Sequence, residues 1–153
     1  MSPIVLLDAG PLGLVTNPKA SPVADQCNRW LEALLVQGTR VLIPEIADYE
    51  VRRELLRAGK ARGVAQLDQF KLALGYLPLT TETMLQAAAF WAQARRQGQP
   101  TADDKALDAD VILAAQAATL GHVGEPVVIA TTNVGHLARF TLARYWHDIH
   151  PEP

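Results

Sequence analysis

Two apolar, strand-like runs that each end in a polar side chain constrain the fold of this chain most. The first is Ile4-Val5-Leu6-Leu7 followed by Asp8, and the second is Val127-Val128-Ile129-Ala130-Thr131-Thr132 followed by Asn133. Both runs are typical of buried parallel strands. In an open α/β sheet, the residue just past the carboxyl end of a strand faces the crevice in which ligands bind. We therefore expect Asp8 and Asn133 to lie at one site.

Strand-like and helical patterns alternate along the chain. Pro44 suits the first turn of a helix, because its missing N–H would be unpaired there, and Thr80 suits a helix cap. The Gly10-Pro11 pair predicts a sharp turn. The expected order is strand 4–7, a helix within 18–37, strand 40–43, helices 44–58 and 64–74, an extended piece at 76–79, a helix from 80, a helix within 101–119, strand 127–131 and a last strand at 145–149. This alternation predicts an α/β fold, a three-layer α/β/α sandwich with a mostly parallel central sheet.

The size and composition of the chain exclude several classes of protein. Its 153 residues suit one domain over 1–153, which is long enough to bury a core without disulfides. A net charge of −2 excludes nucleic-acid binding by bulk positive charge, so any RNA contact is expected to be local. The sequence has no apolar stretch as long as a membrane span and no signal-peptide pattern, which predicts residence in the cytoplasm. Cys27, the single cysteine, is expected to pack a helix.

Further acids lie between the two strand-like runs, at Glu50, Asp108 and Asp110. Carboxylates without cysteine or histidine at ligand spacing point to a hard divalent cation, Mg²⁺ or Mn²⁺. Such a cation suggests phosphoryl chemistry. On a helix, Asp108 and Asp110 would lie about 200° apart, so only one of them can face the site. Asp110 borders the packing stripe that begins at Val111, whereas Asp108 suits a helix cap.

Each candidate also has an ordinary structural interpretation. Asp8 equally fits a turn cap, because aspartate bonds its own backbone in turns. Helix periodicity does not single out Glu50, which also fits a surface acid paired with a basic neighbour. Asn133 also fits the residue that ends a strand. The basic stretch 52–62 fits either a solvated helix face or a contact with phosphate.

The remaining charged positions are expected to lie at the surface. Asp103 and Asp104 fit a solvated loop pair, and whether Asp103 or Asp108 joins the acidic site stays open. None of the histidines lies at the spacing from the cysteine that zinc sites typically have. The histidines are His122, His136, His147 and His150.

Four segments, in order, carry a resemblance to a known family. They are the early strand that ends in Asp8, the segment Pro44-Glu45-Ile46-x-x-Tyr49-Glu50-Val51-Arg52-Arg53-Glu54-Leu55, the segment Asp110-x-Ile112-x-Ala114-Ala115-x-Ala117, and the segment Thr131-Thr132-Asn133-Val134-x-His136-Leu137. With these segments the chain resembles, over nearly its whole length, a PIN-domain ribonuclease, specifically a VapC-like toxin of a type II toxin–antitoxin pair. The resemblance implies a single PIN-like nuclease domain with acids at Asp8, Glu50 and Asp110. Asn133 takes the fourth position, where many relatives have aspartate.

The resemblance also implies a mechanism and partners. Asp8 and Asp110 would hold Mg²⁺ or Mn²⁺ directly, Glu50 would contribute to the metal site through a second ion or a bound water, and a coordinated water would attack an RNA phosphodiester. Asn133 and the Thr132 hydroxyl would orient the water or the phosphate. A cytoplasmic toxin of this kind would form a homodimer and bind an antitoxin.

Two other hypotheses compete with the nuclease. With Asn133 in place of an acid, the site has one fewer negative charge, which weakens cation binding and leaves room for a PIN-like module that binds RNA or protein without catalysis. A haloacid-dehalogenase-like phosphatase also places an aspartate at the first strand tip. That class predicts a second acid two residues later, and Asp8-Ala9-Gly10 lacks it.

Overall fold

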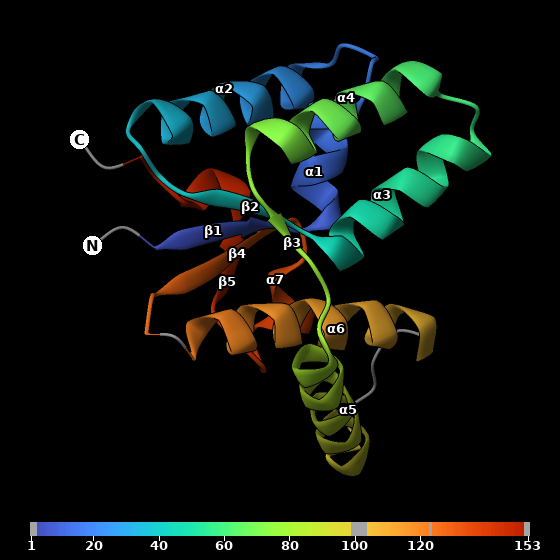
Figure 1. Ribbon diagram of the computed structural model, residues 1–153, viewed down its shortest axis with the longest axis vertical. Coiled ribbons are helices and arrows are strands. Elements are labelled where there is room, and N and C mark those ends of the chain that lie inside the picture. The colour runs from blue at the N-terminus through green and yellow to red at the C-terminus, as the bar shows by residue number, and fades with distance from the viewer. Residues whose placement is uncertain (1–2, 99–103, 123, 152–153) are drawn as a thin grey trace.

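The protein folds as a five-stranded sheet between two layers of helices (Figure 1). The computed structural model describes residues 3–98, 104–122 and 124–151. The strands are β1 (Ile4–Leu7), β2 (Val41–Pro44), β3 (Tyr76–Leu77), β4 (Val127–Thr131) and β5 (Ala143–Tyr145). The helices are α1 (Ala9–Thr16), α2 (Pro22–Val36), α3 (Glu45–Arg57), α4 (Ala61–Ala73), α5 (Thr81–Arg96), α6 (Asp104–Gly121), α7 (Val134–Leu137) and the short 3₁₀ helix η1 (Trp146–Asp148). Within the described residues, no helix combines the length and the apolar character that a membrane crossing needs.

The strands lie in the order β3-β2-β1-β4-β5, and every neighbouring pair is parallel. In the central pair, Ile4 lies opposite Val127 and Leu7 lies opposite Ala130. The chain builds outward from β1 to β2 and β3 on one side, and β4 and β5 complete the other side. The strand order therefore reverses between β1 and β4, which is where open α/β sheets form their ligand crevice. The predicted three-layer, parallel architecture is confirmed.

Alternate residues of the strands enter two separate cores. Val5 and Leu7 point to the layer of α1, α2, α3 and α4, where they pack with Leu12 and Leu31. Leu6 on the same strand points to the opposite layer, where it packs with residues of α6 and α7. Both faces of β1 are buried, as expected for a parallel strand covered by helices on each side. Helix α5 packs outside α6 through a third, smaller cluster of apolar residues (Figure 1).

Several elements agree with the sequence patterns. Strands 4–7 and 127–131 are confirmed, the strand expected at 40–43 is found one residue later, and the helix expected from Pro44 begins at Glu45. Thr80 caps α5, since its hydroxyl accepts a hydrogen bond from the Thr83 N–H at 3.1 Å.

Several predictions of local structure were wrong, among them the loop expected at Asp104, which is the first residue of α6. Gly10 and Pro11 do not make a turn but form the first turn of α1, where a proline is tolerated because its missing N–H has no helical partner. The expected last strand at 145–149 is mostly η1, and β5 ends at Tyr145. Trp30 on α2 holds this last segment, because its Nε1–H donates to the Ile149 carbonyl at 2.7 Å.

Gln116 joins α6 to the sheet and to α3. It is buried, with 1% of its surface exposed. Its Nε2 donates to the Leu77 carbonyl at the end of β3 at 2.8 Å, and its Oε1 accepts from the Ile46 N–H at the start of α3 at 3.4 Å. These two bonds satisfy backbone groups at the edge of the sheet where the strands end, and they fix the position of α6 along it.

We predict that Gln116→Leu lowers the free energy of unfolding by about 1–3 kcal/mol, because it leaves the Ile46 N–H and the Leu77 carbonyl without partners. Urea denaturation followed by circular dichroism measures the change. The matched control is Gln93→Leu on α5, whose side chain is exposed and for which we expect a change within about 0.5 kcal/mol. Equal stabilities of the two variants would contradict this role of Gln116.

Candidate functional site

Asp8 lies at the reversal of the strand order, directly after β1, and both of its carboxylate oxygens accept hydrogen bonds. Oδ1 accepts from the Ala9 N–H at 2.7 Å, so Asp8 caps α1, and Oδ2 accepts from the Thr131 hydroxyl at 2.7 Å. The same Thr131 oxygen accepts from the Asn133 N–H at 2.9 Å. Thr131, the last residue of β4, therefore joins two of the predicted site residues. The capping interpretation of Asp8 and its membership of a site are compatible.

Glu50 and Asp110 bring two further carboxylates close enough to Asp8 for their charges to interact. Glu50 lies on α3 and Asp110 on α6, in opposite helical layers. The pKa of each of the three carboxyl groups is raised, and burial is the main cause. For Glu50 the pKa rises to about 7, because the charge of Asp8 and, less strongly, that of Asp110 add to the burial, while Arg53 acts in the opposite direction. The structure thus brings together the three acids that the sequence analysis selected.

Asn133 reaches this cluster through His136. The Asn133 Nδ2 lies 3.2 Å from the His136 Nδ1, and that nitrogen lies 3.3 Å from the Asp110 Oδ2. A protonated Nδ1 donates to Asp110, whereas a bare Nδ1 accepts from the Asn133 amide. His136 and Asp8 have opposite effects on Asp110, because the histidine lowers the pKa of that carboxyl and the aspartate raises it. Sequence reasoning assigned no role to His136, although its spacing of three residues from Asn133 on a helix was a usable signal.

Two other candidate residues, Thr132 and Asp108, make none of the contacts described above. The Thr132 side chain lies against Gly10, where an added Cβ would sit 2.5 Å from the Thr132 Oγ1, and the hydroxyl that contacts Asp8 is that of Thr131. Asp108 is not a helix cap, because α6 begins four residues earlier, and it lines a groove between α5 and α6. Asp103 lies outside the described residues.

The basic stretch of α3 is largely occupied by ion pairs. Arg52 contacts Asp48 at 3.0 Å and Asp68 at 2.7 Å, so it joins α3 to α4. Arg57 pairs with Glu54 at 2.8 Å on the surface. The interpretation as a helix face with salt bridges is therefore correct for these two arginines.

The three carboxylates are the right kind of ligand for a divalent cation, but their side chains are not arranged to hold one. Among the described residues, no group of three or more His, Cys, Asp or Glu side chains is arranged so that it could hold a metal ion. Carboxylate oxygens are nevertheless the preferred ligands of Mg²⁺ and Mn²⁺. Negative charges that are both buried and close together are costly, and a cation would relieve that cost. We therefore expect ion binding to require small movements of these side chains.

Comparison with solved structures supports the fold. Similar chains occur in the crystal structure of VapBC2 from Rickettsia felis bound to a promoter DNA fragment (TM-score 0.72, 16% identity, 94% of this chain and 98% of that chain) and in FitAcB from Neisseria gonorrhoeae (TM-score 0.67, 20% identity, 94% and 99%). DNA-bound VapBC from Salmonella typhimurium is also similar (TM-score 0.65, 19% identity, 95% and 99%). No family model matches the sequence, and neither does any curated protein. The resemblance to a VapC-like PIN domain is thus confirmed at the level of the fold.

We predict that Glu50 makes the protein less stable as the pH rises from about 5 to 7 in the presence of EDTA. Because its pKa is about 7 in the folded state and near 4.5 in the unfolded state, the folded state binds more protons in this window, and the free energy of unfolding falls with pH. Urea denaturation across the window should show a shallower fall for Glu50→Gln. Glu54→Gln is the matched control, since Arg57 lowers the pKa of Glu54 and moves its titration below the window. An unchanged slope in Glu50→Gln would contradict the assignment.

We predict that Thr131→Val costs about 1–3 kcal/mol of stability, because the Asp8 carboxylate loses a donor and the Asn133 N–H loses its acceptor. The Asp8 pKa should rise further, since the bond from Thr131 is one that lowers it. Denaturation and a ¹³C NMR titration of the Asp8 carboxyl measure the two effects. Thr132→Val makes the same chemical change at the neighbouring exposed position and should alter neither the stability nor the Asp8 pKa.

Proposed function

We propose that the protein is a metal-dependent endoribonuclease that hydrolyses RNA phosphodiester bonds and acts as the toxin of a toxin–antitoxin pair. The observation that carries this proposal is the group of Asp8, Glu50 and Asp110, three carboxyl groups with raised pKa values at the strand-order reversal of a PIN-like fold. A structural cluster of this kind has no benefit for stability, because burial and repulsion both disfavour the charged forms. Such groups are typical of functional sites.

The side chains suggest distinct roles in this reaction. Asp8 and Asp110 would hold Mg²⁺ or Mn²⁺, and Glu50 would complete the site directly or through a bound water. The ion, when bound, lowers the pKa of water and neutralises charge on the phosphate. Without a metal the pKa of Glu50 is about 7, and a bound cation would favour its charged form. The Asn133 amide would orient the phosphate, and the contact of Asn133 with His136 restricts the position of this amide.

We further propose an antitoxin and a second copy of the chain as partners. The similar structures are toxin–antitoxin complexes, which supports the antitoxin. The homodimer follows from the sequence resemblance. Helix α5 is a candidate contact for it, because its apolar side chains Met84, Leu85 and Trp91 are 44%, 69% and 38% exposed.

A PIN-like module without catalysis is the second candidate. The observation that favours it is the arrangement of the described acids, in which no three side chains are placed to hold an ion, together with the neutral Asn133. Such a module would bind RNA or protein and would have no need for Mn²⁺. Metal binding therefore separates the two candidates.

We predict that Mn²⁺ raises the melting temperature of the protein and supports cleavage of a mixed pool of structured RNA, and that EDTA abolishes both effects. Asp8→Asn and Asp110→Asn should lose cleavage at least 100-fold and lose the shift in melting temperature. Asparagine is preferred to alanine at position 8, because it is an equally good helix cap. Gel analysis of the RNA and thermal melts measure the two effects.

The matched control is Asp108→Asn, which removes a carboxylate two residues from Asp110 but outside the cluster. It should behave like the unmodified protein. If Mn²⁺ neither binds nor supports cleavage, the non-catalytic module replaces the nuclease.

A further inference from the structure

A cleft begins at the acidic cluster and runs between α1 and α3. Its volume is about 340 Å³. Ala9, the neighbour of Asp8, and Glu50 line it at the cluster, and Lys60 lines it beyond the end of α3. Most of its lining is apolar, with Val51 and Leu55 contributed by α3. A molecule that contacts the carboxylates therefore has an apolar space directly beside it.

Gly13 keeps this cleft open. It lies inside α1 and lines the cleft, and a Cβ added there would meet no atom within 4 Å. A glycine inside a helix destabilises it relative to alanine, so packing alone does not account for this residue. Gly10, one turn earlier, is different, because a Cβ there would collide with Thr132. The packing of the fold therefore does not require a glycine at position 13, and a larger side chain there would occupy the cleft.

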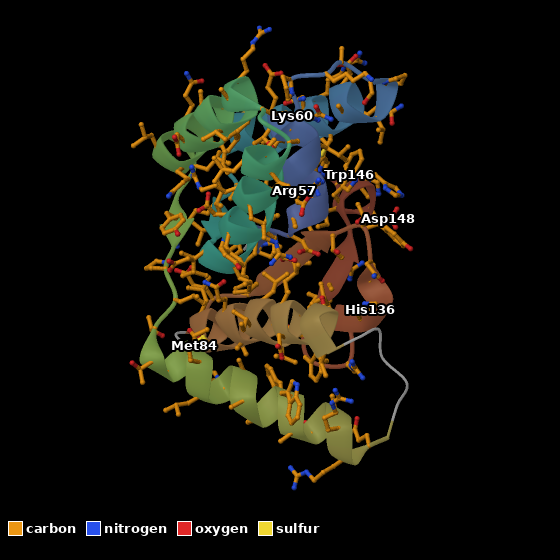
Figure 2. All side chains as sticks on the ribbon, turned by 90° about the vertical axis from the view of Figure 1, so that its right-hand side faces the viewer. Arg57, Lys60, Met84, His136, Trp146 and Asp148 are labelled. Atoms are coloured by element: carbon orange, nitrogen blue, oxygen red, sulfur yellow. The ribbon has the colours of Figure 1, made fainter. Side chains whose placement is uncertain are left out.

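The rim of the cleft carries charges of both signs, because Glu54 lines it beside Arg57, with which it pairs at 2.8 Å. Arg57 and Lys60 lie in the helical layer that contains α1 and α3, whereas His136 belongs to the opposite layer (Figure 2). Lys60 has no ion-pair partner among the described side chains. Thr16 and Asn17 at the end of α1 also line the cleft, where the buried Thr16 hydroxyl donates to the Leu12 carbonyl at 2.9 Å and the Asn17 Oδ1 accepts from the Lys19 N–H at 3.0 Å. Apolar walls with the Lys60 ammonium at the edge suit a planar base attached to a phosphate.

We propose that this cleft binds one nucleotide of the RNA strand, the one next to the phosphate held at the acidic cluster, and so contributes to the choice of cleavage position. The proposal rests on the proposed nuclease function, because Glu50 belongs both to the cluster and to the cleft wall. The base lies between α1 and the apolar side chains of α3, and Lys60 contacts a phosphate. The volume falls in the range of about 300–1,000 Å³ that is usual for small-molecule sites.

The test is a titration with each of the four nucleoside 5′-monophosphates in the presence of Mg²⁺, followed by NMR of the Val51 and Leu55 methyl groups. These nucleotides have no phosphodiester to be cleaved, so binding is read independently of catalysis. We expect shifts of both methyl signals, with one base preferred. Gly13→Leu, which fills the cleft, should weaken binding at least tenfold. Lys60→Gln should weaken binding of all four nucleotides alike, because a phosphate contact does not depend on the base.

Gly121→Leu is the matched control, because this glycine at the end of α6 also has no atom within 4 Å of an added Cβ and lies outside the cleft. It should bind nucleotides like the unmodified protein. Thermal melts verify that Gly13→Leu is folded, and its melting temperature should be no lower than that of the unmodified protein, since leucine favours a helix over glycine.

The outcomes separate this inference from the proposed nuclease. If no nucleotide shifts the methyl signals of the unmodified protein, the inference is overturned whatever the activity, and a protein segment becomes the better candidate occupant. If the protein cleaves RNA and Gly13→Leu cleaves it at the same positions and rate, the inference fails while the nuclease stands. If nucleotides bind as expected but RNA is not cleaved with Mn²⁺, the cleft is supported and the nuclease fails.

Discussion

The parallel pairing of β1 with β4 is the constraint on which the rest of the structure depends. Its register places Leu7 opposite Ala130, so the two strands end together, and Asp8 and Thr131 meet at one edge of the sheet. Because β1 is central and covered on both faces, a shift of one residue would turn its buried side chains to the wrong layers. The register that builds the core is therefore the register that assembles the acidic cluster.

The acidic cluster opposes the stability that the two cores provide. Burial raises the pKa of Asp8, and the hydrogen bonds from Ala9 and Thr131 only partly offset the loss of water. Glu50 and Asp110 add like charges from opposite helical layers. Proteins commonly retain such unfavourable groups where function needs them, and the surrounding packing holds them in place. Gln116 is part of that support, because it fixes α6, which carries Asp110, against β3 and α3.

Local sequence patterns predicted most helices and strands, but they could not predict contacts between segments that are distant in the sequence. The apolar run 4–7 and the Thr80 cap depend on nearby residues, so they could be read directly. Helix α1 was missed because Gly10 and Pro11 favour a turn in isolation, whereas the Asp8 cap and packing on the sheet favour a helix. Asp8 was selected from the end of its strand and Asp110 from the edge of a packing stripe, whereas Glu50 was selected by resemblance, since helix periodicity did not single it out. The contact of His136 with Asp110 exists only once α7 and α6 are packed together.

The double role of Asp8 has an evolutionary consequence. Its carboxylate both caps α1 and belongs to the acidic cluster, and asparagine fills the first role equally well. A single-base mutation from an aspartate to an asparagine codon would therefore remove a charge from the site while the fold persists. Selection on folding alone cannot preserve this acid, so a lineage under that selection alone would drift toward a stable protein of the same shape without the charge. On this architecture, loss of the negative charge at position 8 is structurally easier than loss of the fold.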